Sequence, residues 1–196
     1  ARYPIKNAPD SGECPSIERG FINFGTLNNS YKVTPFSIKV WAKIMIYCDR
    51  SEFLFIRKCY SSVYIQKSIR SEFEKNGISS DRIKFMDNIS KSRSHFDCYN
   101  DLDICLDTLP LTGGVTTYES LWMGVPVLTI EGSNLHQRIS SSILRHAGLC
   151  ELVSTNQEDM IETALRIAND TDIRTYWRKH LRVSLMDTDI FNPGKT

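Results

Sequence analysis

The residues whose types and spacing best suit binding chemistry lie in one segment, Leu106–Trp122. It reads Leu-Asp-Thr-Leu-Pro-Leu-Thr-Gly-Gly-Val-Thr-Thr-Tyr-Glu-Ser-Leu-Trp, so paired glycines follow an apolar stretch and two threonines then open a predicted helix. Glycines let backbone N–H groups approach an anion without a side chain in the way. The first turn of a helix adds unpaired N–H donors and the positive end of the helix dipole. The segment therefore predicts a phosphate-binding loop.

The same residues also fit a purely structural interpretation. Thr116 and Glu119 have the spacing of a helix capping box, and Gly113-Gly114 is typical of a tight turn. Glu119 has a functional alternative, because a carboxylate one turn inside a phosphate-binding helix can accept hydrogen bonds from ribose hydroxyls. From the residues alone both interpretations stay open.

Two further side chains are candidates for the same site. Phe24–Lys32 is a small polar loop after a predicted strand, and its lysine can bring an ammonium group to a diphosphate. Such a charge-assisted hydrogen bond contributes roughly 1.5–3 kcal/mol. His95, before another predicted strand, can stack on a nucleobase, although a lone histidine also fits an ordinary surface position.

Several other kinds of site are excluded by their missing motifs. The chain has no GxGxxG motif for dinucleotide binding and no GxSxG nucleophile elbow of a hydrolase. Pro193–Thr196 is similar to the end of a P-loop, but Asp189 stands where the first glycine of that motif belongs. No His/Cys/Asp cluster has metal-ligand spacing, so we expect no metal and no resident cofactor.

The composition of the chain limits the kinds of partner that it can bind. The 196 residues carry 24 Lys and Arg against 23 Asp and Glu, a net charge of +1, so nucleic-acid binding is disfavoured. No apolar run is long enough to span a membrane, and the first residues do not resemble a secretory signal. We therefore expect no membrane partner and a cytoplasmic protein. Because the sequence starts at Ala1 rather than Met, we also expect it to be a piece of something longer.

Short β-prone stretches alternate with helical ones from Gly20 onward. Strands joined by helix-length crossovers pair in parallel and are covered by helices, so the pattern predicts an α/β fold, a doubly wound parallel sheet of Rossmann-like type. The predicted strands are Phe21–Phe24, Glu52–Arg57, Arg82–Met86, Asp103–Asp107 and Pro126–Ile130. The predicted helices are Pro35–Tyr47, Ser61–Asn76, Ser94–Asn100, Thr116–Met123, Arg138–Ala147, Asn156–Asn169 and Asp172–Leu185.

The same pattern predicts one domain. Residues 1–19, rich in Pro and Gly without any period, are predicted to be a linker or arm, and residues 20–185 form the α/β lobe. Residues 186–196 are predicted to be a truncated carboxyl-terminal tail. In open α/β sheets ligands bind beyond the carboxyl ends of the strands, where the loops described above lie.

Together these segments resemble the carboxyl-terminal catalytic lobe of glycosyltransferase family 41, the O-GlcNAc transferase and SPINDLY-like family. The resemblance runs in order from about Gly20 to Leu185. Its most specific part is the block Asp103–Thr129. The residues that carry it are Phe24–Asn29 with Lys32, His95, Asp103–Thr108, Gly113–Val127 and Arg138.

The resemblance implies the donor-binding Rossmann-like lobe of a GT-B glycosyltransferase, an enzyme that needs no metal. By position, Lys32 matches the lysine that contacts the diphosphate and is needed for activity, and Asn29 matches a polar residue on the phosphate side. His95 matches the histidine that lies against the base, and Glu119 matches an acidic residue on the ribose. The residues that match the phosphate-holding loop and helix start are Gly114, Val115, Thr116 and Thr117.

The implied reaction is transfer of GlcNAc from UDP-GlcNAc to Ser or Thr hydroxyls of a protein acceptor, with inversion. An amino-terminal catalytic lobe and tetratricopeptide repeats are partners that this chain would lack, so we expect the fragment alone to be inactive. Two departures from the family, Ser92 and Cys98, stand where basic residues are common. A GDP-fucose-dependent O-fucosyltransferase lobe and a non-catalytic interaction module remain as alternatives.

Overall fold

The computed structural model describes residue 5 and residues 8–87 and 94–188. Within these residues six strands form a single sheet, in which every pairing is parallel. The strands are β1 (Ile22–Thr26), β2 (Ser51–Ile56), β3 (Ile83–Met86), β4 (Ile104–Leu106), β5 (Val127–Ile130) and β6 (Val153–Ser154). The predicted doubly wound Rossmann-like fold is confirmed.

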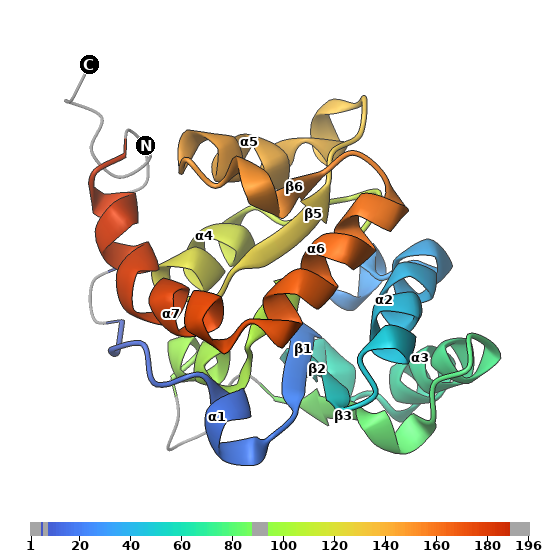
Figure 1. Cartoon of the computed structure of the whole chain (residues 1–196). Helices are drawn as coiled ribbons and strands as arrows, with labels where there is room; N and C mark the ends of the chain where they lie inside the picture. Colours follow the sequence, from blue (N-terminus) through green and yellow to red (C-terminus); the bar gives the residue numbers. More distant parts are fainter. Residues whose placement is uncertain (1–4, 6–7, 88–93, 189–196) are drawn as a thin grey trace.

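The strand order is β3-β2-β1-β4-β5-β6, so the chain leaves β1 in one direction and later returns to β4 on its other side. In Figure 1, β2 and β3 lie on one side of β1, and β5 and β6 lie on the other. Phe24 is in register with Phe53 of β2 and with Ile104 of β4. Because parallel crossovers are right-handed, the crossover helices of the two halves cover opposite faces of the sheet. The gap between the loops after β1 and β4 is the topological switch point, where ligands of such sheets bind.

Helices cover both faces of this sheet. On one side α2 packs against α3 and α6, and on the other α4 packs against α5 and α7. The α-helices are α1 (Pro15–Arg19), α2 (Pro35–Tyr47), α3 (Val63–Lys75), α4 (Val115–Trp122), α5 (Ile139–His146), α6 (Gln157–Asn169) and α7 (Thr171–Met186). The short 3-10 turns are η1 (Ser30–Lys32), η2 (Lys58–Ser61), η3 (Ser80–Arg82), η4 (Phe96–Asp101), η5 (Leu135–Gln137) and η6 (Cys150–Leu152).

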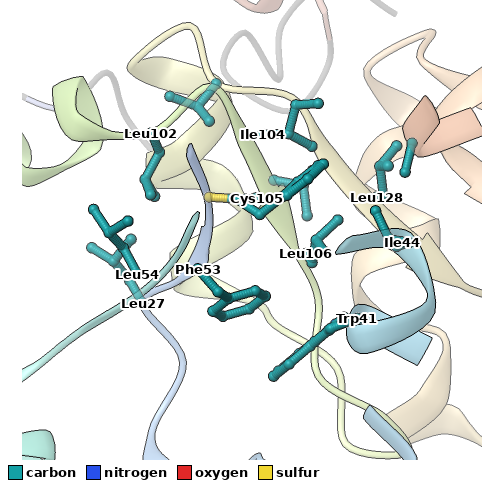
Figure 2. Close-up of a cluster of buried hydrophobic side chains, with 14 of the residues drawn as sticks. Leu27, Trp41, Ile44, Phe53, Leu54, Leu102, Ile104, Cys105, Leu106 and Leu128 are labelled. Atoms are coloured by element: carbon teal, nitrogen blue, oxygen red, sulfur yellow. The ribbon is translucent and has the colours of Figure 1, made fainter. Parts of the chain in front are cut away.

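Aromatic rings fill the core between the sheet and the helices α2 and α3. Trp41 of α2 stacks on Phe53, with ring centroids 4.7 Å apart (Figure 2). The ring centroid of Phe55 lies 4.7 Å from that of Phe53. Phe73 of α3 closes the cluster at 5.6 Å from Phe53. These rings are fully buried, so they hold β2 and the two helices rigidly beside the switch point.

The predicted elements agree with the structure except in three places. The α-helix expected at Ser94–Asn100 is replaced by the 3-10 turn η4 (Phe96–Asp101), and β6 was not predicted. A strand of two residues is too short to show alternation in the sequence. The third difference is helix α1, which lies in the segment expected to be a linker or arm.

Helix α1 is tied to the sheet through a buried carboxylate. Asp103 accepts hydrogen bonds from the Ser16 hydroxyl at 2.7 Å and from the backbone N–H of Asn23, in β1, at 2.9 Å. Asp103 is 1% exposed, so these bonds are shielded from water. Residues 14–16 are buried as a result.

Close packing at Gly25, in the middle of the central strand, yields a stability prediction. A Cβ at this position would lie 2.5 Å from the Leu54 carbonyl oxygen and 2.5 Å from Leu102 Cδ2. Gly25→Ala should therefore lower the free energy of unfolding by about 1–3 kcal/mol, measured by urea denaturation. Gly12→Ala is the control, because its Cβ would meet only Asn100 at an ordinary 3.5 Å. Equal stability of the two variants would contradict the prediction.

Candidate functional site

The loops at the switch point are joined by one buried carboxylate, Asp107, which directly follows β4. Its Oδ1 accepts hydrogen bonds from the backbone N–H groups of Gly113 at 2.8 Å and Thr108 at 2.9 Å, and from Asn28 Nδ2 at 3.1 Å. Its Oδ2 accepts a bond from the Thr129 hydroxyl at 2.9 Å. Burial raises the pKa of Asp107, and hydroxyl hydrogen bonds, including that of Thr129, oppose this rise. Asp107 therefore fixes the glycine loop relative to the loop after β1.

Gly113 is required by this packing. A Cβ there would lie 2.5 Å from Thr117 Oγ1 and 3.2 Å from Asp107 Oδ1. Gly114 is different, since its Cβ would meet only Ile139 at 3.5 Å. The first glycine thus brings the backbone against the Asp107 carboxylate, and the second serves as the N-cap residue of α4.

The start of α4 offers unpaired backbone donors. No described residue accepts a hydrogen bond from the N–H groups of Val115, Thr116 or Thr117, as expected for a first helical turn. The Thr116 hydroxyl donates to Asn28 Oδ1 at 2.9 Å, and the Thr117 hydroxyl is bonded to Ser140 Oγ at 2.8 Å. The backbone N–H groups, rather than the two hydroxyls, are therefore the free donors here.

The capping-box interpretation of Thr116 and Glu119 does not hold in the structure. Helix α4 begins at Val115 after Gly114, and no side chain caps it. Glu119 is the fifth residue of the helix, and its carboxylate bonds the side chains of His95 and Tyr99. A different role for Glu119 is needed.

Lys32 reaches the glycine loop from the other side of the switch point. The 3-10 turn η1 carries it, and its Nζ donates a 2.8 Å hydrogen bond to the Thr112 carbonyl oxygen, next to Gly113. Helix α2 fixes this approach, because its N-cap Thr34 donates to the Leu109 carbonyl oxygen at 2.6 Å. The predicted proximity of the lysine to the loop is therefore present in the structure.

The charge of Lys32 is tuned by its surroundings. Burial lowers the pKa of its ammonium group from the ordinary 10.5, the Asp107 carboxylate raises it, and Arg57 lowers it. Arg57 follows β2 and donates from Nη1 to the Leu27 carbonyl oxygen at 3.0 Å. The site therefore has a second cation close to the first, and the pair favours an anionic ligand.

A second polar group lies one turn further along α4. Glu119 Oε2 is 2.9 Å from His95 Nε2 and 3.1 Å from the Tyr99 hydroxyl, and Glu119 is only 8% exposed. Thr116 and Glu119 are three residues apart and share a face of the helix. The two candidates His95 and Glu119, which are far apart in the sequence, are thus brought together.

Asn29 lies at the start of η1, and its place on the phosphate side of the site stays a prediction. It is the N-cap residue of η1, and its side-chain oxygen is 3.5 Å from the Ser30 hydroxyl. The neighbouring Asn28 instead links Asp107 to Thr116. Sequence reasoning did not select Asn28, Asp107, Tyr99 or Arg57; the available signal was that Asp107 and Arg57 each follow a buried strand directly.

Of the two residues that differ from the family pattern, Ser92 and Cys98, the structure describes only Cys98. Cys98 is buried in η4 and its thiol is 3.8 Å from the Ser94 carbonyl oxygen. Ser92 lies outside the described residues. Arg138 pairs with Glu131 at 3.4 Å near the start of α5.

The described part of the chain offers neither a metal-binding cluster nor a membrane-spanning helix. No three or more His, Cys, Asp or Glu side chains there are grouped so as to hold a metal ion. None of the helices in that part is long and apolar enough to cross a membrane.

Comparison with known proteins identifies the family. A model of glycosyl transferase family 41 matches residues 16–195. The chain belongs to glycosyl transferase family 41. The resemblance carried by the glycine loop and the residues around it is thereby confirmed.

Relatives in this family include plant and animal proteins. The chain is 33% identical over 191 residues to the probable UDP-N-acetylglucosamine–peptide N-acetylglucosaminyltransferase SPINDLY of Solanum lycopersicum, covering 96% of this chain and 20% of that protein. It is 27% identical to the UDP-N-acetylglucosamine–peptide N-acetylglucosaminyltransferase of Caenorhabditis elegans, covering 87% of this chain and 14% of that protein. The chain thus spans about a fifth or less of the length of these curated relatives.

Solved structures agree with the assignment to this family. A mutant of the Thermobaculum terrenum O-GlcNAc transferase superposes with a TM-score of 0.83 at 34% identity, covering 93% of this chain and 34% of that one. S. aureus TarM superposes with a TM-score of 0.61 at 13% identity, covering 93% of this chain and 34% of that one. The second likeness shows the fold alone, a Rossmann-like lobe of GT-B type.

The electrostatic setting of Lys32 can be measured. We expect the Lys32 pKa to lie below 10.5, because burial disfavours the ammonium form, so its charge is present below that pKa and lost above it. Titration of the Lys32 side chain by NMR measures the value. Arg57→Gln should raise the Lys32 pKa, since it removes a neighbouring positive charge. A Lys32 pKa at or above 10.5 in the unmodified chain would contradict this assignment.

Proposed function

We propose that this chain is the nucleotide-sugar-binding lobe of an inverting protein O-glycosyltransferase, which transfers GlcNAc from UDP-GlcNAc to Ser or Thr hydroxyls. One observation carries the proposal. The Lys32 ammonium group bonds the Thr112 carbonyl oxygen, in the loop that leads into the free N–H groups at the start of α4. One turn along α4, Glu119 bonds His95, which precedes η4.

The two ends of this site match the two ends of a nucleoside diphosphate. Backbone N–H groups and an ammonium group bind phosphate oxygens, while a carboxylate accepts hydrogen bonds from ribose hydroxyls and an imidazole can lie against a base. The proposal assigns the diphosphate to Lys32 and the residues Gly114 to Thr117. It assigns the nucleoside to Glu119 and His95, with Asn29 on the phosphate side.

Transfer needs stabilisation of the leaving group. As the bond between the sugar C1 and the diphosphate oxygen breaks, that oxygen keeps the electron pair while the acceptor hydroxyl oxygen bonds to C1. Preplaced donors lower the barrier by binding the negative charge that develops, which is electrostatic catalysis. Lys32 and the α4 N–H groups supply this stabilisation in the proposal, without a metal ion.

The names of the relatives support this donor. The Solanum lycopersicum and Caenorhabditis elegans proteins are named for transfer from UDP-N-acetylglucosamine to peptides, and the Thermobaculum terrenum protein for O-GlcNAc transfer. In the proposal the acceptor hydroxyl and its proton acceptor are positioned by a catalytic lobe that the 196 residues do not include. The chain by itself should bind nucleotide with little or no turnover.

Nucleotide binding tests the proposal. Calorimetric titration of the chain with UDP and with GDP should give heat with UDP, because the proposal assigns both the diphosphate and the nucleoside to residues of this chain. Preference for GDP would favour the fucosyl donor, and absence of binding by either nucleotide would favour a non-catalytic module.

Lys32→Ala is the matched variant for this titration. Loss of one charged contact worth roughly 1.5–3 kcal/mol should weaken diphosphate binding about tenfold or more. Lys67→Ala serves as the control for loss of charge. Lys67 is an exposed residue of α3 and is remote from the glycine loop in sequence. Equal affinity in the Lys32 variant and the unmodified chain would remove Lys32 from the site.

Glu119→Gln separates binding from folding. The variant keeps the size of the side chain but replaces a carboxylate by an amide, so it should weaken UDP binding about tenfold. Binding of inorganic pyrophosphate should be unchanged, because that ligand has no ribose. An effect on the melting temperature with no effect on UDP affinity would show that Glu119 is structural.

A further inference from the structure

Tyr99 is a fully buried residue of η4 that sequence reasoning did not select. It is 0% exposed, and its hydroxyl lies 3.1 Å from Glu119 Oε2 and 3.5 Å from the Thr116 carbonyl oxygen. Both partners belong to α4. These hydrogen bonds offset the cost of burying the hydroxyl, so Tyr99 can hold the Glu119 carboxylate in place.

The two oxygens of Glu119 are used unequally. Within the described residues, the side chains that bond this carboxylate are His95 and Tyr99, and both approach Oε2. Oε1 is left as an acceptor in a side chain that is nearly buried. Two donors on one oxygen restrict the rotation of the carboxylate, so the direction in which Oε1 points is set before any ligand arrives.

The direction of the bond from Tyr99 is determined by chemistry. An ionised carboxylate can only accept, so the phenol O–H must donate. Burial and the Glu119 charge raise the pKa of Tyr99, which keeps the phenol protonated. The Tyr99 ring also meets the His95 ring edge-on, with centroids 5.8 Å apart, so the same residue supports both candidates for nucleoside binding.

Tyr99 is itself anchored from the far side. Arg178 of α7, 3% exposed, donates from Nη1 to the Tyr99 carbonyl oxygen at 3.4 Å and to the Met123 carbonyl oxygen at 3.3 Å, just beyond the end of α4. It also bonds the Leu102 carbonyl oxygen. One guanidinium group thus joins η4 to the end of α4, which keeps Tyr99 and Glu119 at a constant separation.

We propose that Tyr99 is a positioning residue for the nucleoside, holding the Glu119 carboxylate through Oε2 so that Oε1 is directed at the ribose hydroxyls. The inference rests on the proposed function and deepens it. Tyr99 does not touch the ligand in this arrangement. Its contribution is to orient the group that does.

The test compares two ligands in one variant. Tyr99→Phe removes only the hydroxyl, and calorimetry measures its affinity for UDP and for inorganic pyrophosphate. We expect UDP affinity to fall about tenfold while pyrophosphate affinity stays constant, because pyrophosphate has no ribose. The ratio of the two affinities is independent of the fraction of protein that is folded, so a loss of stability alone does not change it.

Tyr60→Phe is the matched control. Tyr60 is 1% exposed, and its hydroxyl donates at 2.8 Å to the Asn28 carbonyl oxygen in the loop after β1. The variant therefore loses an equally buried hydroxyl bond without touching Glu119. Its melting temperature should fall, but the ratio of UDP to pyrophosphate affinity should stay that of the unmodified chain.

A double-mutant cycle completes the test. In a Glu119→Ala background, Tyr99→Phe should have no further effect on the affinity ratio, since the group that it orients is gone. An unchanged ratio in Tyr99→Phe alone, or an equal effect with and without Glu119, would overturn the inference. Failure of the unmodified chain to bind UDP or GDP would instead overturn the proposed function, so the two failures are distinguishable.

Discussion

The site depends on the buried Asp107 carboxylate and on the donors that surround it. This one side chain bonds the glycine loop, the loop after β1 and strand β5, which come from three separate parts of the chain. Burying a carboxylate is unfavourable unless donors replace water, and here backbone N–H groups and a threonine hydroxyl do so. The arrangement of the loops follows, because each loop must offer its donor to the same two oxygens.

Helix α4 divides the site into two chemically different ends. Its first turn exposes unpaired N–H donors, which suit phosphate, and its second turn carries the Glu119 carboxylate, which suits hydroxyl groups. The Lys32 ammonium group bonds the loop just before the helix. Because an α-helix rises about 1.5 Å per residue, the backbone of α4 sets the distance between the phosphate end and the hydroxyl end of the site. At the far end of the helix, Arg178 of α7 bonds the carbonyl oxygen of the C-cap residue Met123 and that of Tyr99 in η4.

Prediction from the sequence succeeded where the signal was local. Pro35–Tyr47 was predicted with the bounds that the structure shows, because Pro at the first position and apolar residues at helical spacing mark it clearly. The glycine loop and the helix after it were predicted for similar reasons. The role of Thr116 was not, since a capping pair and a bond to Asn28 look alike in sequence. Tyr99 carried no local signal, because its partner lies 20 residues away.

The sequence by itself determined the alternation of strands and helices, the parallel α/β class and the resemblance to one family, since periodicity and contiguous motifs are properties of neighbouring residues. Only the tertiary structure decided that Lys32 meets the Thr112 carbonyl oxygen, that Asn28 rather than Asn29 connects the loops, and that His95 and Tyr99 share one oxygen of Glu119. The physical reason is that these contacts join segments distant along the chain, whose distances are set by the strand order and by packing in the core.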